Sequence, residues 1–216
     1  MKIGFLGLGV MGLPMAKNLV KRSGCPVMGF DVVPAQVESF RAAGGIAAKD
    51  AVEIYKTCDV IMQILPTHPI IIDSVEQAIR YGKPGNIIVD LSSTAPDIIL
   101  DLYEKAEAAG MSLLDSPISG GNPMAIAGTL AIMTGGRREA FEAVKPLLSC
   151  MGDPVYTGGP ASGSVTKLVN NMIGGATLVA IAEGYAFAAK AGIDLQTTFD
   201  ATRGGFAGGP LYDNKV

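Results

Sequence analysis

Short apolar runs alternate with amphipathic stretches along most of the chain. The runs have the length of buried strands, and the stretches between them carry apolar residues at helical spacing. The first strands are predicted at Lys2–Leu6, Pro26–Phe30, Val60–Leu65, Asn86–Asp90 and Ser112–Leu114. The helices that connect them are predicted at Met11–Lys21, Pro34–Ala43, Asp50–Thr57, Pro69–Arg80 and Pro96–Ala109. This alternation is typical of βαβ units, so we expect an α/β protein with a doubly wound parallel sheet.

The regular alternation of strands and helices ends after residue 114. A loop rich in Gly, Ser and Pro comes first, and a strand, a helix, a second strand, a Gly/Pro-rich joint and one long helix follow it. These elements are predicted, in that order, at Asp115–Gly121, Thr129–Thr134, Glu139–Leu148, Pro154–Thr157, Gly158–Gly163 and Ser164–Ala191. We therefore expect a domain boundary near Gly163, with one domain over residues 1–162 and the start of a helical domain over residues 163–216.

The long helical stretch carries more apolar surface than so short a domain can cover. Roughly 50 residues, mostly in one helix, can hardly bury it alone. We expect the helix to pack on a second copy of the chain in a homo-oligomer, or to belong to a domain that is C-terminally truncated at Val216. Its apolar part, Leu168–Ala182, has 15 residues, whereas a membrane span needs about 20. We therefore predict a buried helix and no membrane partner.

Composition narrows the classes of partner and site. Hydrophobic residues make up 49% of the chain, which is enough for a packed core. The net charge is −3, whereas a nucleic-acid-binding protein usually has a basic surface, so we expect no nucleic-acid partner. Cys25, Cys58, Cys150 and the single histidine, His68, would all have to converge to hold zinc, so we expect no metal site. Reduced thiols instead suit a cytoplasmic protein.

A glycine-rich turn follows the first predicted strand and opens the first predicted helix. It forms a G-x-G-x-x-G pattern, made of Gly7, Leu8, Gly9, Val10, Met11 and Gly12. The first glycine permits a tight turn, the second lets the backbone approach a pyrophosphate, and the third lets helix and strand pack closely. The helix N-terminus offers free N–H groups to the phosphates. The sequence therefore predicts a dinucleotide-binding domain of Rossmann type.

Asp31 stands 19 residues after Gly12, at the end of the second predicted strand. A carboxylate at this place can bond the ribose hydroxyls, and it repels a 2′-phosphate. We therefore expect NAD(H) rather than NADP as the cofactor. An ordinary turn residue is the alternative interpretation of Asp31.

Two further loops follow apolar strands, Leu65-Pro66-Thr67 and Ser92-Ser93-Thr94. Ligands of open parallel sheets lie outside the carboxyl ends of the strands. Both loops are therefore expected to line the cofactor groove, although each could also be an ordinary turn.

Two patterns suggest chemistry on a small acid. Ser119, Gly120 and Gly121 present a hydroxyl and backbone N–H groups, a combination that suits a carboxylate. Lys167 and Asn171 are four residues apart and share one face of the long helix. A lysine in an apolar pocket can have a lowered pKa and act as acid or base, while an amide one turn on could hold a substrate hydroxyl. A plain loop and a solvated lysine are the alternatives.

The run from Phe5 to Leu19 resembles the signature of the 3-hydroxyisobutyrate dehydrogenase-like family of β-hydroxyacid dehydrogenases. Asp115–Gly121 is similar to the substrate loop of that family, and Gly163–Asn171 to its catalytic helix. The three motifs lie in the same order, and the likeness spans the whole chain. Within the family, Ser119–Leu130 and Arg203–Gly208 resemble the branch that reduces tartronate semialdehyde.

The resemblance implies an NAD(H)-dependent oxidoreductase of small β-hydroxy acids with Lys167 as general acid and base. Its substrate-binding residues fall on Ser119, Gly120, Gly121, Asn171 and the neighbouring Asn170. A residue beside the nicotinamide ribose falls on Ser93, and the other cofactor-binding residues that we expect are the glycine turn, Asp31, Leu65 and Pro66. Family members continue past this point with more helices and a further lysine near the cofactor. Oxidation of 3-hydroxyisobutyrate or L-serine, and nucleotide binding without catalysis, stay open as alternative functions.

Overall fold

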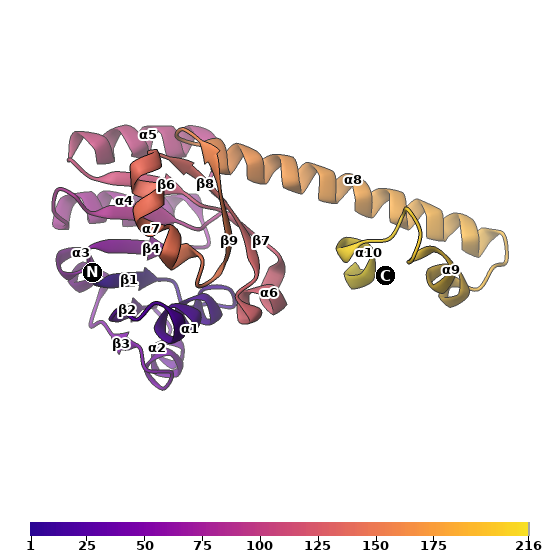
Figure 1. Ribbon diagram of the computed structural model, residues 1–216, viewed down its shortest axis with the longest axis horizontal. Coiled ribbons are helices and arrows are strands. Elements are labelled where there is room, and N and C mark those ends of the chain that lie inside the picture. Colours follow the sequence, from indigo (N-terminus) through magenta and orange to yellow (C-terminus); the bar gives the residue numbers. More distant parts are fainter. Residues whose placement is uncertain (216) are drawn as a thin grey trace. The chain divides into compact units, whose positions relative to one another are not determined.

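The computed structural model describes residues 1–215. The chain divides into two compact units, Met1–Lys167 and the part from Leu168 onward. The first unit holds a nine-stranded sheet in the order β3-β2-β1-β4-β5-β6-β8-β7, with β9 paired to β8 (Figure 1). The order changes direction at β1, which lies between β2 and β4. Doubly wound sheets bind ligands at such a switch point.

The first six strands are parallel, and the later ones depart from that pattern. Strand β8 runs antiparallel to β6 and β7, whereas β9 runs parallel to β8. The bounds are β1 (Ile3–Leu6), β2 (Val27–Phe30), β3 (Ile46–Ala47), β4 (Val60–Gln63), β5 (Ile87–Asp90), β6 (Ser112–Asp115), β7 (Ile118–Ser119), β8 (Leu130–Gly136) and β9 (Gly152–Gly158). The predicted Rossmann-type α/β fold is therefore confirmed.

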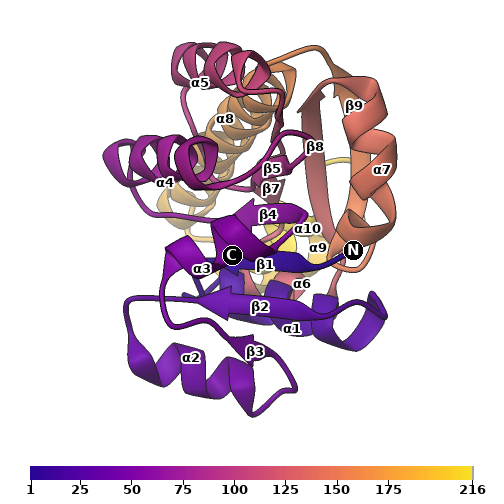
Figure 2. The ribbon, with the colours of Figure 1, turned by 90° about the vertical axis from the view of Figure 1, so that its left-hand side faces the viewer.

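Helices cover both faces of this sheet, and each face has its own apolar core. Residues of α1, α2, α6 and α7 share one core cluster, and residues of α3, α4 and α5 share the other. Figure 2 shows α4 and α5 beside each other on one side and α7 on the other. The bounds are α1 (Gly12–Arg22), α2 (Pro34–Arg41), α3 (Ala51–Thr57), α4 (His68–Tyr81), α5 (Pro96–Ala108), α6 (Gly121–Ala127) and α7 (Arg138–Leu148).

Three short elements differ from the sequence-based expectation. The strand β3 is only two residues long and exposed, so it leaves no alternating pattern in the sequence. The predicted loop Asp115–Gly121 contains β7, and its last residue begins α6. A helix that starts at a glycine and contains Pro123 gives no sequence signal of its own. Strand β7 is stabilised by its pairing with β8, a tertiary contact that local propensity does not predict.

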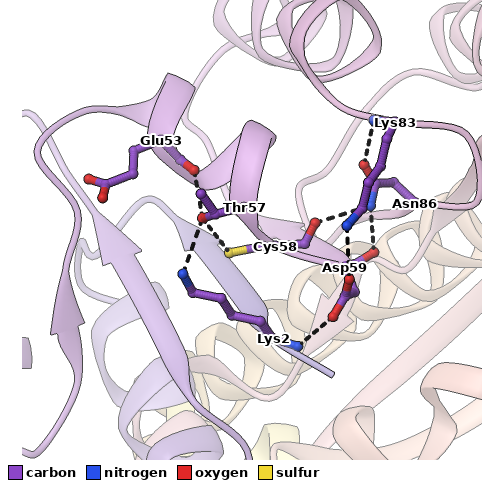
Figure 3. Close-up of polar contacts among 7 residues, drawn as sticks. All are labelled: Lys2, Glu53, Thr57, Cys58, Asp59, Lys83 and Asn86. Atoms are coloured by element: carbon purple, nitrogen blue, oxygen red, sulfur yellow. Dashed lines mark hydrogen bonds and ion pairs between the residues drawn. The ribbon is translucent and has the colours of Figure 1, made fainter.

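Polar side chains join the amino ends of three strands, as Figure 3 shows. The Asp59 carboxylate accepts hydrogen bonds from the Lys2 backbone at 2.8 Å and from the Lys83 ammonium at 3.3 Å. The Asn86 amide donates to the carbonyls of Cys58 and Asp59. These bonds connect residues next to β1, β4 and β5, which fixes the edge of the sheet opposite the expected ligand site.

Helix α8 (Ser162–Lys190) begins in the first unit and continues into the second, which also holds α9 (Leu195–Thr202) and α10 (Pro210–Lys215). By length and composition alone α8 could cross a membrane, a test that core helices of soluble proteins also pass. Only 6% of its apolar window is buried within the described chain. The described residues cover little of that surface, so burial of the helix against a second copy or a longer domain stays a prediction.

Candidate functional site

The glycine turn joins β1 to α1 at the carboxyl edge of the sheet. Gly7 has a φ of +89° and its N–H bonds the Phe30 carbonyl, so the turn is fixed to the neighbouring strand. A Cβ at Gly12 would collide with the Gly7 carbonyl, which makes that glycine a requirement of the close strand–helix contact. A Cβ at Gly9 would meet nothing within 4 Å. The space beside Gly9 is therefore open to a ligand, as a bound pyrophosphate requires.

The middle residues of the turn differ in what they can offer a ligand. The Leu8 side chain is fully buried in the core, so only its backbone belongs to the site. Val10 is 76% exposed, and Met11 lines both cavities described below. The first N–H groups of a helix have no partner within it, so the start of α1 can donate to phosphate oxygens.

Asp31 follows β2 and is fastened at both carboxylate oxygens. One oxygen accepts from the Leu8 N–H at 2.6 Å and the other from the Val33 N–H at 2.8 Å. A carboxylate oxygen can accept a second bond, so Asp31 can still receive ribose hydroxyls. The backbone bonds hold the negative charge at the edge of the cavity, where it would oppose a 2′-phosphate.

Two adjoining cavities form one groove along the carboxyl ends of the central strands. The first, of about 670 Å³, extends from Asp31 and the glycine turn to Leu65 and Pro66. The second, of about 580 Å³, extends from Leu65 and Pro66 to Ser93 and Ile118. The structure therefore brings Asp31, the glycine turn, Leu65, Pro66 and Ser93 together along the walls of these two adjoining cavities.

A buried carboxylate that sequence reasoning missed holds the loops of this groove. Asp90, the last residue of β5, accepts from the Ser92 N–H at 3.2 Å and from the Thr94 hydroxyl at 2.5 Å. The Ser92 hydroxyl in turn accepts from the Leu65 N–H at 3.0 Å. Burial raises the pKa of the Asp90 carboxyl, while its hydrogen bonds oppose that rise. The sequence feature that could have indicated this role is an aspartate at the end of an otherwise apolar strand.

The same network continues beneath the groove. The Gln63 amide donates to Asp90 at 3.3 Å and accepts from the Ser74 hydroxyl at 2.7 Å. The Ser74 and Tyr55 hydroxyls share a further bond of 2.8 Å. Residues of β4, β5, α3 and α4 are thus linked in one buried chain of hydrogen bonds. Such a chain fixes the shape of the groove floor, because each member left unpaired would carry the cost of an unsatisfied buried polar group.

The predicted substrate loop is attached to the glycine turn. Ser119 ends β7, and Gly120 and Gly121 both have positive φ values, 137° and 71°, where α6 begins. The next side chain, Asn122, donates to the Val10 carbonyl at 2.7 Å. Sequence reasoning missed this bond, which joins residues 112 positions apart. The predicted substrate loop and the glycine turn are therefore linked directly by this hydrogen bond.

Lys167 lies on α8, at the end of the first unit, and is half-buried. Burial lowers the pKa of its ammonium group. A lysine with a lowered pKa can give up and take back a proton at lower cost than a solvated one. Asn170 and Asn171 lie on the part of α8 that belongs to the second unit, where the Asn170 amide donates to the Asn171 side chain at 3.3 Å.

A metal site finds no support in the described part of the chain. No group of three or more His, Cys, Asp and Glu side chains there could hold a metal ion.

Two family models match the sequence. Residues 2–159 match the NAD-binding domain of 6-phosphogluconate dehydrogenase. Residues 161–216 match the NAD-binding domain of NADP-dependent 3-hydroxyisobutyrate dehydrogenase. These matches show that the chain is an NAD(H)-binding protein.

Proteins similar to this chain are dehydrogenases of the same kind as these family models. A 2-(hydroxymethyl)glutarate dehydrogenase of Eubacterium barkeri is 36% identical over 91% of this chain and 66% of its own length. An NAD-dependent L-serine dehydrogenase of Pseudomonas aeruginosa is 33% identical over 94% of this chain and 69% of its own length. The chain thus spans about two thirds of the length of these relatives.

A solved structure shows the same fold. The 3-hydroxyisobutyrate dehydrogenase of Mycobacterium tuberculosis, determined with L-serine, has a TM-score of 0.89 and 33% identity, covering 97% of this chain and 72% of that one. The fold, the glycine turn, the groove and these likenesses agree. The chain belongs to the 3-hydroxyisobutyrate dehydrogenase-like family of NAD-dependent β-hydroxyacid dehydrogenases.

Proposed function

We propose that the protein reduces tartronate semialdehyde to glycerate with NADH, and that Lys167 is its general acid. The observation that carries the chemistry is the half-buried Lys167 with its lowered pKa, at the start of a helix that follows the dinucleotide-binding sheet. The choice of substrate is supported by the resemblance of Ser119–Leu130 and Arg203–Gly208 to that branch of the family.

Each group of the chain has a separate task in this proposal. Ser119 and the N–H groups of Gly120 and Gly121 hold the substrate carboxylate, and Asn171, with Asn170 beside it, orients the reacting oxygen. Lys167 donates a proton to the aldehyde oxygen as that oxygen gains negative charge, and it accepts the proton again when the alcohol is oxidised. When bound, NADH supplies the hydride that completes the alcohol together with this proton.

The cofactor would lie along the groove from Asp31 to Ser93. Asp31 would bond the ribose hydroxyls of the adenosine half and exclude a 2′-phosphate. Ser93, exposed beside the second cavity, would contact the ribose of the nicotinamide half. The open space beside Gly9 would admit the pyrophosphate.

A second copy of the chain is the partner that we propose for α8. Large apolar side chains of that helix are exposed, among them Met172 at 73% and Phe187 at 77%. Contiguous exposed apolar surface of this kind is typical of protein interfaces.

L-Serine and 3-hydroxyisobutyrate are the alternative substrates in this proposal, because relatives are named as dehydrogenases of these acids.

Replacement of Lys167 tests the proposal. In the full-length protein, Lys167→Ala should lower kcat with tartronate semialdehyde by about 10²–10⁴-fold, because general acid catalysis contributes about that much. NADH affinity, measured by fluorescence titration, should stay within about twofold. Lys190→Ala removes an exposed lysine from the last turn of the same helix and serves as the matched control.

Three results would contradict the proposal. Turnover of Lys167→Ala near that of the natural protein would remove Lys167 from the mechanism. Higher kcat/KM with L-serine or 3-hydroxyisobutyrate would move the substrate assignment to that acid. Tight NADH binding without turnover of any of these acids would instead indicate a nucleotide-binding module.

A further inference from the structure

The N-terminus of α8 lacks a capping side chain of its own. Helices usually begin after a residue such as Ser, Thr, Asp or Asn, whose side-chain oxygen accepts from a backbone N–H of the first turn. Ala161 holds that place before α8, and it has no such oxygen. Ala161 is also buried, with a φ of 65° that is rare for a residue other than glycine. Another part of the chain has to hold this helix start in place.

The Asp115 carboxylate supplies the missing cap from a distant strand. One of its oxygens accepts from the Ala161 N–H at 3.1 Å, and the other accepts from the Ser164 N–H at 2.7 Å. Asp115 is the last residue of β6 and only 1% exposed. A carboxylate is also the group that the positive end of the helix dipole favours. One buried side chain thus binds two backbone donors at the helix start, the N–H groups of Ala161 and Ser164.

The junction leaves the carboxylate little freedom to move. A Cβ at Gly163 would collide with the backbone oxygens of Asp115 and Met133. A Cβ at Gly135 would come within 2.6 Å of the Asp115 side chain and of the Ser162 hydroxyl. The Ser162 hydroxyl also shares a hydrogen bond of 2.9 Å with Thr157. The backbone of the α8 start therefore packs directly on the backbone of β6 and β8 beside Asp115. Because this contact leaves no space for a shift, the position of Asp115 determines where the first turn of α8 lies.

Two parts of the proposed active site depend on this one residue. Ser119 of the substrate loop follows Asp115 by four positions, and Lys167 follows the capped Ser164 by three, within one helical turn. Burial raises the pKa of the Asp115 carboxyl to about 6, and the hydrogen bonds from Ser164 and Ala161 oppose that rise. At neutral pH the group is therefore mainly ionised, in the form that accepts from both donors.

The geometry points to Asp115 as a positioning residue, which caps α8 from the end of β6 and thereby sets the place of the Lys167 ammonium relative to the substrate loop. The catalytic part of this inference rests on the proposed function. The positional part concerns only contacts within the first unit. It can be tested without any turnover.

The test compares Asp115→Asn with Asp59→Asn in the full-length protein. Asparagine keeps one acceptor oxygen and turns an N–H₂ group toward the second donor, so one of the two caps is lost. Asp59 lies at the opposite edge of the sheet and provides the same chemical change away from α8. Four quantities are measured: amide hydrogen exchange at Ser164, the pKa of Lys167 from competitive acetylation, kcat, and NADH affinity.

In Asp115→Asn we expect Ser164 exchange to be at least about tenfold faster and the Lys167 pKa to rise toward its ordinary value. We expect kcat to fall by about 10- to 100-fold, because a displacement of about 1 Å can cost that much, while NADH affinity stays within about twofold. Asp59→Asn should leave all of these quantities near their natural values. A change confined to thermal stability, with equal exchange, Lys167 pKa and kcat, would overturn the inference.

The readouts separate this inference from the proposed function. If the natural protein turns over none of the acids, the proposed function fails, but altered Ser164 exchange and Lys167 reactivity still support the cap. Asp115→Ser, with a shorter side chain, replaces Asp115→Asn if the latter does not fold. If neither variant folds, Asp115 is a requirement of the fold as a whole, and its assignment as a positioning residue is overturned.

Discussion

Asp59 and Asp90 lie at opposite ends of neighbouring parallel strands and meet opposite surroundings. Asp59 stands before β4 with its side chain 47% exposed and ion-pairs with Lys83 at 3.3 Å. The backbone hydrogen bond from Lys2 is the main reason that the pKa of Asp59 is lowered. Asp90 ends β5, is 1% exposed, and burial raises its pKa. The same residue type is thus solvated at one edge and nearly enclosed at the other.

The polar groups at the two edges of the sheet have different tasks. At the amino edge, the Asp59–Lys83 ion pair and the Asn86 amide connect the strand ends to each other. At the carboxyl edge, Asp90 and Asp115 are buried and each holds a loop or a helix start that lines the proposed site. Charged groups are costly to bury, so their place at this edge indicates a positional task.

The largest effect should come from Asp90→Ala compared with Asp59→Ala. Loss of Asp90 leaves the Ser92 N–H, the Thr94 hydroxyl and the Gln63 amide without their partner, so the free energy of unfolding should fall by about 3 kcal/mol or more. Loss of the exposed Asp59 should cost about 1 kcal/mol or less. Urea unfolding followed by circular dichroism measures both. Equal losses in the two variants would contradict the contrast between the edges.

The pH dependence of stability should also distinguish the two edges. The folded state binds the Asp115 proton more tightly than the unfolded state, because the pKa of Asp115 is raised from 3.8 to about 6. The free energy of unfolding should therefore fall as pH rises from about 4 to about 6, by up to about 3 kcal/mol. The lowered pKa of Asp59 has the opposite sign and favours the folded state as pH rises through its titration.

Urea unfolding at several pH values between 4 and 7 tests this in Asp115→Asn and Asp59→Asn. Subtraction of each variant from the natural protein isolates one carboxyl group from all the others. For Asp115 the difference should decline with pH and then level off above about 6. A difference that instead grows with pH would mean that hydrogen bonds, and not burial, dominate the titration of Asp115.

The smallest effect concerns the choice of cofactor at the carboxyl edge. Asp31→Ala removes the negative charge that would oppose a 2′-phosphate, so the ratio of NADPH to NADH dissociation constants should fall by about tenfold, or about 1.4 kcal/mol. Fluorescence titration with each cofactor measures the ratio. Asp59→Ala, which removes a charge from the other edge, should leave it unchanged. An unchanged ratio in Asp31→Ala would place Asp31 away from the ribose.

Local pattern was sufficient wherever the signal repeats within a few residues. The alternation of apolar runs and amphipathic stretches predicted the parallel strands and the helices between them, and the spacing of Gly7, Gly9 and Gly12 predicted the turn at the switch point. The position of Asp31 followed from its distance along the chain. Pattern failed for β3, β7 and α6, which are too short or too rich in glycine to carry a period.

By itself, the sequence determined the fold class, the glycine turn and the residue types available for chemistry, because periodicity and spacing are properties of neighbouring residues. Tertiary structure alone decided which distant groups meet. Asp90 holds the Ser92 loop, Asp115 caps a helix 46 positions away, and Asn122 ties the substrate loop to the glycine turn across 112 positions. The physical reason is that a buried polar group must find a partner wherever folding brings one, and no local pattern records that partner.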